Sequence, residues 1–140
     1  MASNVFKLQI AQFVEKAKGN ADLVTRRAAL GIFSSIIQKS PVDTGRFKGN
    51  WQCAITTIPA GEVNTLDKSP LGDVGTVAIN RADQTMLDFK MGETIYFINN
   101  LIYSTTLEYG HSKQAPAGMV RLSIGEWNQF VEKAVAELPK

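Results

Sequence analysis

The residues with the greatest potential for chemistry are His111, Ser112 and Glu108, which lie close together in the sequence. A histidine near a hydroxyl and a carboxylate suggests a nucleophilic triad, in which the histidine must reach both partners with defined geometry. Neighbours in sequence point their side chains apart, so Ser112 is poorly placed to act as a nucleophile for His111. We interpret His111 as a solvent-exposed histidine of a turn.

Other catalytic and ligand-binding signatures are missing from the sequence. The glycines never fall in the order that cradles a phosphate group in nucleotide-binding loops. Cys53 is the single cysteine, and Lys48 is its one cationic neighbour in sequence, so an activated thiolate is unsupported. The acidic residues do not cluster, and no cysteine and histidine spacing suits zinc. We therefore expect no catalytic residues, no cofactor and no metal, and a protein that is not an enzyme.

Glu108 is the charged residue that most needs an explanation. It lies among Tyr103, Leu107 and Tyr109, where an unpaired carboxylate would be costly. A partner is expected, either an arginine or the backbone N–H groups of a turn. Our hypothesis is that the partner is Arg46, and the alternative is an exposed glutamate on a helix.

The turn at residues 41–46 has recognisable chemistry. The side chain of Asp43 or Thr44 can accept the N–H two residues further on, and Gly45 can adopt the left-handed conformation. The segment at residues 99–121 also carries turn residues. Its Asn pair, Gly110 and Pro116 predict a strand end, a short helical segment at residues 101–109, a turn and a helix start.

The remaining elements follow from apolar periodicity. It predicts helices at residues 5–17, 21–39, 80–91 and 117–138, and strands at residues 51–58 and 93–98. The stripe on the helix at 21–39 is wide, so we expect that helix to be covered on more than one side. The expected fold is α+β, with helices packed on a small antiparallel sheet and a long C-terminal helix. Its expected core anchors are Trp51, Trp127 and Phe130.

Composition narrows the class of protein further. A chain of 140 residues fits one domain at residues 1–140 with a sizeable core. A net charge of +2 with interspersed acids and bases gives no nucleic-acid footprint. The single cysteine is typical of a reducing cytoplasm, and we expect neither a signal peptide nor a membrane span.

Two segments of the chain resemble the two signatures of a family of tailed-bacteriophage proteins, the small tail-completion or neck proteins that join the tail tube to the head. The family's first signature is Asp-Thr-Gly followed by a basic and a hydrophobic residue. The second is an Asn-Asn-Leu-x-Tyr run, then Glu-Tyr-Gly or Glu-Phe-Gly, then an Ala-Pro-x-Gly-Met-Val helix start. The first is matched by Asp43, Thr44, Gly45, Arg46 and Phe47, and the second by Asn99, Asn100, Leu101, Tyr103, Glu108, Tyr109, Gly110, Ala115, Pro116, Gly118, Met119 and Val120. Ile102 stands where the family often has Pro, and Phe47 where it often has Leu; both look like packing substitutions.

This resemblance implies a structural virion protein, assembled in the host cytoplasm, that completes the tail and helps to connect it to the head. Such a protein would form a closed ring, which we expect to be hexameric. Its partners would be other copies of the chain and other connector and tail-tube proteins. Genomic DNA would pass through the lumen without specific binding, which the small net charge suits.

The resemblance also implies a subunit and partner interface, made by Asp43, Thr44, Gly45, Arg46, Lys48, Glu108, Tyr109, Gly110 and His111. Arg46 and Lys48 would contact a neighbouring subunit or the passing DNA, and the alternative for both is a solvated turn. The loop at residues 59–75, rich in Pro and Gly, would be a flexible arm that orders only against a neighbour. The alternative for this loop is an ordered surface hairpin.

Two other functions stay open from the sequence. One is a tail terminator or a head-side stopper of the same connector. The other is a DNA-binding regulator, which needs a basic recognition helix. The pair Arg26 and Arg27 is the only cluster in a predicted helix that approaches this requirement.

Overall fold

The computed structural model describes residues 20–138, so the helix predicted at residues 5–17 lies outside the described range. Within that range, six helices pack with one two-stranded antiparallel sheet, which confirms the predicted α+β fold. None of these helices is long and apolar enough to cross a membrane. The elements in order are α2 (Ala21–Gln38), α3 (Arg46–Gly49), β1 (Trp51–Ile55), α4 (Val77–Met86), β2 (Ile95–Asn99), α5 (Ser104–Glu108), α6 (Val120–Ile124) and α7 (Trp127–Ala136).

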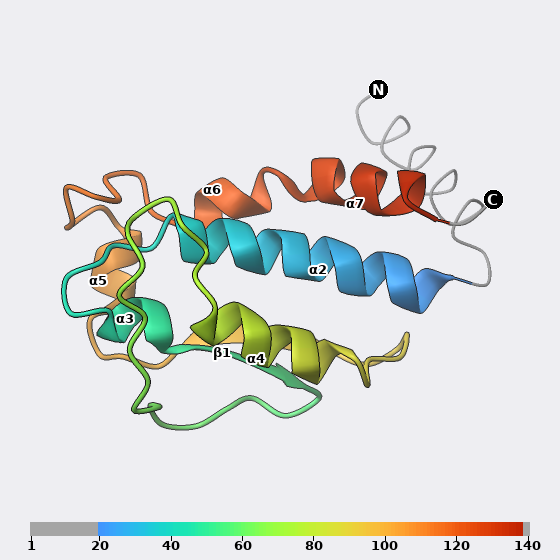
Figure 1. Cartoon of the computed structure of the whole chain (residues 1–140), viewed down its shortest axis with the longest axis horizontal. Coiled ribbons are helices and arrows are strands. Elements are labelled where there is room, and N and C mark those ends of the chain that lie inside the picture. The colour runs from blue at the N-terminus through green and yellow to red at the C-terminus, as the bar shows by residue number, and fades with distance from the viewer. Residues whose placement is uncertain (1–19, 139–140) are drawn as a thin grey trace.

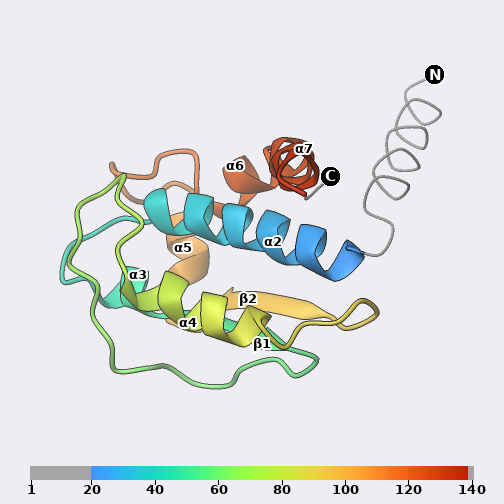
Figure 2. The same cartoon turned by 45° about the vertical axis from the view of Figure 1, so that its right-hand side comes forward.

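Helix α2 runs through the middle of the molecule, between α6 and α7 on one side and α4 and the sheet on the other (Figure 1; Figure 2). Its wide apolar stripe explains this position, because each part of the stripe is covered by a different neighbour. Ile36 and Ile37 belong to one core cluster, Phe33 to a second, and Val24 to a third with α7. The prediction that this helix is covered on more than one side is confirmed.

The sheet is attached to α2 by stacked aromatic rings. Strands β1 and β2 pair from Trp51 opposite Asn99 to Ile55 opposite Ile95. The ring of Phe97 lies 5.0 Å from that of Trp51 and 3.9 Å from that of Phe33, nearly parallel to both. Trp51 is only 4% exposed and donates its indole N–H to the Ser40 hydroxyl at 2.8 Å. Trp51 is therefore a core residue.

The C-terminal helix is present, but it is shorter than predicted and divided in two. Helix α6 ends at Ile124, and α7 begins at Trp127 after Gly125 and Glu126. Gly has a weak helix preference, and the Glu126 N–H bonds to the Ser123 carbonyl in a tight turn instead of continuing the α-helical ladder. The break changes which side chains face α2.

Because the helix is divided, the prediction of one core anchor is wrong. Trp127 is 39% exposed and is not a core anchor. Phe130 is half-buried and packs against α2 at Gly31, where a Cβ would meet the Phe130 ring at 2.6 Å. The apolar stripe predicted for one continuous helix is therefore interrupted by the turn at Gly125.

Other boundaries moved by a few residues. Strand β1 ends at Ile55 instead of residue 58, because Thr56 has φ +73, which is outside the extended region. Helix α4 begins at Val77, so Asn80 lies inside the helix instead of capping it. The short helix predicted at residues 101–109 is α5, Ser104–Glu108.

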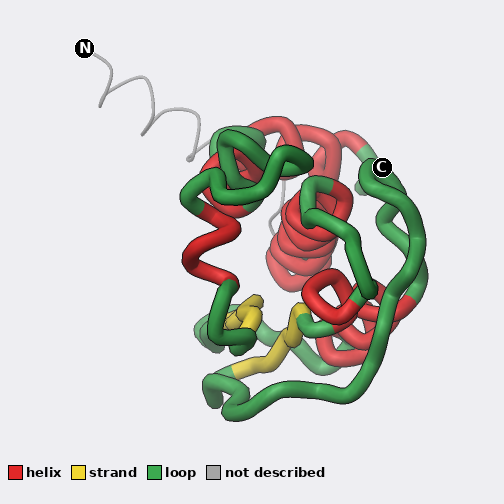
Figure 3. Tube along the Cα trace, turned by 90° about the vertical axis from the view of Figure 1, so that its left-hand side faces the viewer, coloured by secondary structure: helices red, strands yellow, loops and turns green. Residues whose placement is uncertain are grey.

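The long loop at residues 56–76 passes along the sheet and then rises at the end of the molecule that holds α3 and α5 (Figure 1). Figure 3 faces that end and shows loops drawn in green on the outside of the fold. The loop contains no strand, but it is bonded to the domain: the Val63 N–H donates to Asn50 Oδ1, the Thr65 hydroxyl to the Gly49 carbonyl, and the Gly72 N–H to the Gln38 carbonyl. These contacts favour an ordered surface segment, and ordering only against a neighbour stays a prediction.

Candidate functional site

The two segments that carry the resemblance lie against each other. The Asn99 side chain donates to the Phe47 carbonyl at 2.8 Å. Gln114 and Val42 exchange two hydrogen bonds, each of 2.9 Å, between the Gln114 amide and the Val42 backbone. The rings of Phe47 and Tyr103 lie 6.2 Å apart. Residues far apart in the sequence therefore form one structural unit.

A groove of about 690 Å³ lies between these two segments, and we call it the turn groove. Phe47, Tyr103 and Leu107 contribute buried or half-buried apolar surface to it. The lining of the turn groove is completed by Pro41, Val42, Asp43, Thr44, Gly45, Arg46, His111, Ser112, Lys113 and Gln114. A lining that mixes apolar side chains with polar and charged ones suits recognition of a protein segment.

Three of the expected interface residues on the first segment are exposed: Asp43, Thr44 and Arg46. The Thr44 hydroxyl accepts the Arg46 N–H at 3.2 Å, which is one of the two turn bonds predicted from the sequence. Arg46 forms an ion pair with Glu62 of the long loop.

Gly45 faces the long loop and not the solvent. It is buried, has φ +86, and accepts the Asp67 N–H at 2.9 Å through its carbonyl. A Cβ at this position would lie 2.5 Å from the Asp67 carbonyl oxygen. Glycine is required here both by the left-handed conformation and by the approach of the loop, so Gly45 has a structural role, and its place in a partner interface stays a prediction.

The position of Lys48 differs from the prediction. Its side chain is fully buried, with 0% exposure, and its ammonium donates to backbone carbonyls of the long loop. Burial lowers its pKa, although the nearby charges of Asp67 and Asp73 act in the opposite direction. Lys48 therefore contacts neither a neighbouring subunit nor DNA.

Glu108 has both kinds of partner that the sequence suggested, but not Arg46. Its Oε1 accepts the N–H groups of Met119 and Val120 at 3.0 and 2.9 Å. Its Oε2 accepts the backbone N–H and the Nε–H of Arg121, each at 3.0 Å. The first N–H groups of a helix have no partner within it, so Glu108 satisfies the start of α6. The hypothesis of a pair with Arg46 is wrong, because Arg46 binds Glu62.

These contacts perturb the acidity of Glu108. Burial acts to raise the pKa of the carboxyl group, but the three backbone N–H donors and the Arg121 side chain outweigh burial and lower the pKa below its usual value. Glu108 is therefore a charged capping group, bound to the fold through both oxygens.

The residues after Glu108 form the exposed edge of the second segment. Tyr109 is 65% exposed, and the guanidinium of Arg121 lies over its ring at 4.7 Å from the centroid. Gly110 has φ +91 beside the Pro116 carbonyl, and His111 is exposed. Tyr109 and His111 are thus available to a partner.

The triad suggested by residue types does not assemble. The Glu108 carboxylate is occupied by α6 and Arg121, and the Ser112 hydroxyl accepts the Gln114 N–H at 3.2 Å. In residues 20–138, no three histidine, cysteine or acidic side chains are grouped to hold a metal ion. Burial raises the pKa of the Cys53 thiol to about 11, which disfavours the reactive thiolate.

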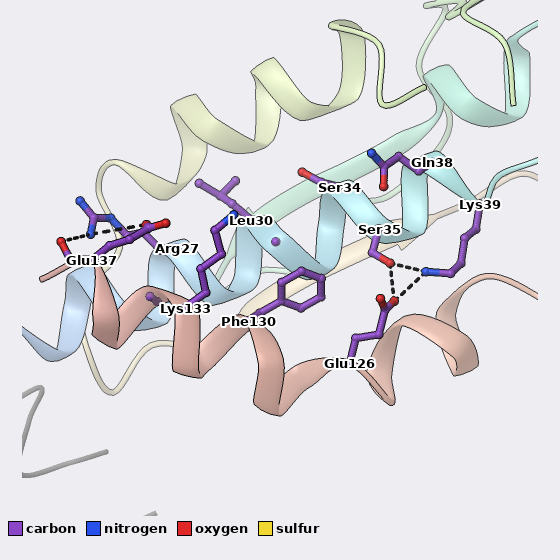
Figure 4. Close-up of a pocket in the computed structure, with 12 residues that line it drawn as sticks. Arg27, Leu30, Ser34, Ser35, Gln38, Lys39, Glu126, Phe130, Lys133 and Glu137 are labelled. Carbon is purple, nitrogen blue, oxygen red and sulfur yellow. Dashed lines mark hydrogen bonds and ion pairs between the residues drawn. The ribbon is translucent and has the colours of Figure 1, made fainter. Parts of the chain in front are cut away.

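A second groove, of about 540 Å³, lies between α2 and α7 and holds a polar cluster that the sequence reasoning missed (Figure 4). Glu126 Oε1 lies 2.6 Å from Lys39 Nζ and accepts the Ser35 hydroxyl at 2.6 Å. Lys39 Nζ therefore donates to the same carboxylate oxygen that accepts the Ser35 hydroxyl. The cluster joins α2 to the start of α7. The spacing of Ser35 and Lys39, one helical turn apart, is the signal that could have found it.

Comparisons of this chain with protein-family models, with curated proteins and with solved structures find no match.

Proposed function

We propose that this protein is a structural virion protein, a tail-completion or neck component that joins the tail of a tailed phage to its head. The observation that carries the proposal is the packing of the two resembling segments into one unit around the turn groove. Asn99 and Gln114 of the second segment bind the backbone of the first. Residues that resemble the signatures thereby share one local structure.

The exposed residues of this unit support an assembly surface. Ile102, which follows β2, is 94% exposed, and Tyr109 is 65% exposed. Large apolar side chains in such positions mark interaction sites when they gather on one surface. Asp43, Thr44, Arg46 and His111 supply polar contacts on the same segments.

In the proposed ring, copies of the chain contact one another through different faces, as closed cyclic assemblies require. Other connector and tail-tube proteins lie above and below, and genomic DNA passes through the lumen without specific binding. The chemistry of the site is recognition and not turnover, and neither a cofactor nor a metal takes part.

The alternative function, a DNA-binding regulator, has less support. It needs Arg26 and Arg27 free on one helix face. Arg27 instead binds the C-terminal end of α7, with its Nη1 3.4 Å from the Glu137 carbonyl and 4.0 Å from the Glu137 carboxylate.

The function is tested by a stop codon placed in this gene in the phage. We expect separate heads and tails by electron microscopy, and joined particles once the wild-type protein is supplied. Joined, infectious particles that lack the protein would contradict the proposal, and tight sequence-specific DNA binding at physiological salt would favour the regulator.

The surface is tested by supplying Ile102→Asp instead of the wild-type protein. We expect a folded free protein and joining reduced at least tenfold. The matched control is Leu87→Asp, which charges a leucine that is 56% exposed at the end of α4 and should leave joining intact. Equal joining by both variants would remove Ile102 from the interface.

A further inference from the structure

The long loop is bound to the domain mainly through polar groups. Two of its largest apolar side chains, Leu66 and Leu71, are 50% and 44% exposed. Apolar burial by these two residues therefore contributes little to holding the loop in place. Val74, near the end of the loop, packs against the core, so the residues before it depend mainly on hydrogen bonds and charge.

The strongest such contact is made by Lys48, which enters the loop from α3. Its Nζ donates to the carbonyls of Ser69 and Pro70 at 3.3 and 3.1 Å, and also to the Asp73 carbonyl. An ammonium group has three N–H donors, so these three carbonyls match its full capacity.

Charge in the surroundings supports the same contact. Asp67 is 5% exposed, and the charges of Asp67 and Asp73 attract the Lys48 ammonium. Asp67 Oδ1 accepts the backbone N–H and the hydroxyl of Ser69. A buried ammonium without compensation would be very costly, and here the carbonyl dipoles and the two carboxylates offset part of that cost.

We propose that the Lys48 ammonium is the built-in structural cation of the loop at residues 56–76, bound in a cup of three backbone carbonyls, and that it orders the loop before any partner binds. Without the ammonium, the three carbonyls would converge on an empty space and repel one another. The cup then becomes a binding site for a small alkylammonium ion. This role does not depend on the proposed function.

The first test is hydrogen exchange in the full chain carrying Lys48→Met, which keeps a long apolar side chain and removes the charge. The amides of Asp67 and Gly72 report on the loop, because they donate to the Gly45 and Gln38 carbonyls. We expect their exchange to accelerate at least tenfold, while exchange in α2 is unchanged. The matched control is Lys68→Met, which removes an exposed charge from the same loop and should leave both rates unchanged.

The second test is chemical rescue of Lys48→Ala. Alanine keeps the β carbon, so propylammonium supplies the missing atoms and the charge, whereas 1-propanol fills the space without a charge. We expect propylammonium, and not propanol, to restore slow exchange at Asp67 and Gly72. Should Lys48→Met fail to fold at all, folding of Lys48→Ala must return in propylammonium alone.

Three results would overturn the proposal: unchanged loop exchange in Lys48→Met, equal acceleration in Lys68→Met, or equal rescue by propanol. The first two would mean that the ammonium does not order the loop. The third would mean that Lys48 acts by filling space and not by its charge.

Discussion

The turn groove and the groove between α2 and α7 are held together in different ways. Beside the turn groove, within the two segments that form it, side chains bind the backbone: Asn99 binds the Phe47 carbonyl, and Glu108 binds the first N–H groups of α6. Between α2 and α7, side chains bind side chains, as in the Lys39 and Glu126 pair.

This difference decides how freely residues can be replaced. A side chain that satisfies buried backbone groups leaves them unpaired when it is removed, which is expensive. A partly exposed ion pair is screened by water and contributes little. We therefore expect the backbone-binding residues of the two segments that form the turn groove to be restricted in type, and those between α2 and α7 to be more replaceable.

Within the two segments that form the turn groove, the largest effect should come from Gly45→Ala. The new methyl group would meet the Asp67 carbonyl oxygen at 2.5 Å in a residue with φ +86. We expect the free energy of unfolding to fall by about 4 kcal/mol, since strain and a backbone clash add together. The control is Gly61→Ala, at φ +76 with nothing within 4 Å, which should cost about 1 kcal/mol. Urea unfolding measures both, and equal losses would contradict the account of Gly45.

Glu108→Gln should have the next largest effect, about 2 kcal/mol, because a neutral amide replaces a carboxylate that accepts charge-assisted hydrogen bonds. The folded state lowers the pKa of Glu108 below its usual value of 4.5. Its contribution is therefore fully present above that value and is lost as the pH falls through the lowered pKa.

The stability gap between wild type and Glu108→Gln should thus close in acid. Unfolding measured at pH 7 and at successively lower pH values below 4.5 tests the sign. Glu132→Gln, at an exposed position of α7, is the control and should give no gap at either pH. A Glu108 gap that stays constant would show that the charge is unimportant.

Trp127→Ala should cost about 1.5 kcal/mol, since a side chain that is 39% exposed buries only part of its apolar surface. Trp51→Ala removes a buried ring from the aromatic stack and should cost about 4 kcal/mol. Thermal unfolding monitored by circular dichroism compares the two. Similar costs would mean that the division of the C-terminal helix does not expose Trp127.

The smallest effect should be the coupling between Lys39 and Glu126. Both side chains are about one-third exposed, so a double-mutant cycle with Lys39→Met and Glu126→Gln should give about 0.5–1 kcal/mol. Raising the salt concentration should reduce it further. A coupling free energy as large as the loss of stability in Glu108→Gln would contradict the expected difference between the two regions.

Local patterns were sufficient for the class of fold and for most of its elements. The apolar stripe of α2 was wide enough to predict cover on more than one side, and the Thr and Ile content of residues 51–58 indicated a strand. The turn chemistry of Thr44 and the left-handed Gly45 follow from residue type alone. The loop at residues 59–75 was recognised from its Pro and Gly content.

Local patterns could not predict contacts between residues that are distant in the sequence. Glu108 needed an arginine or backbone N–H groups, and only the packing of α5 against α6 decided that Met119, Val120 and Arg121 supply them. The sequence predicted that Lys48 would be exposed, whereas in the fold the loop at residues 56–76 covers its ammonium group. The division at Gly125 was also unpredicted, since the apolar period continues through it.

The sequence by itself determined the approximate positions of most helices, of both strands and of the turns, because these depend on neighbours within a few residues. The tertiary structure alone decided which charges are buried, which carbonyls surround Lys48, and that Trp51 and not Trp127 lies in the core. The physical reason is that burial and pairing depend on segments distant in the chain, whose approach no local period of side chains encodes.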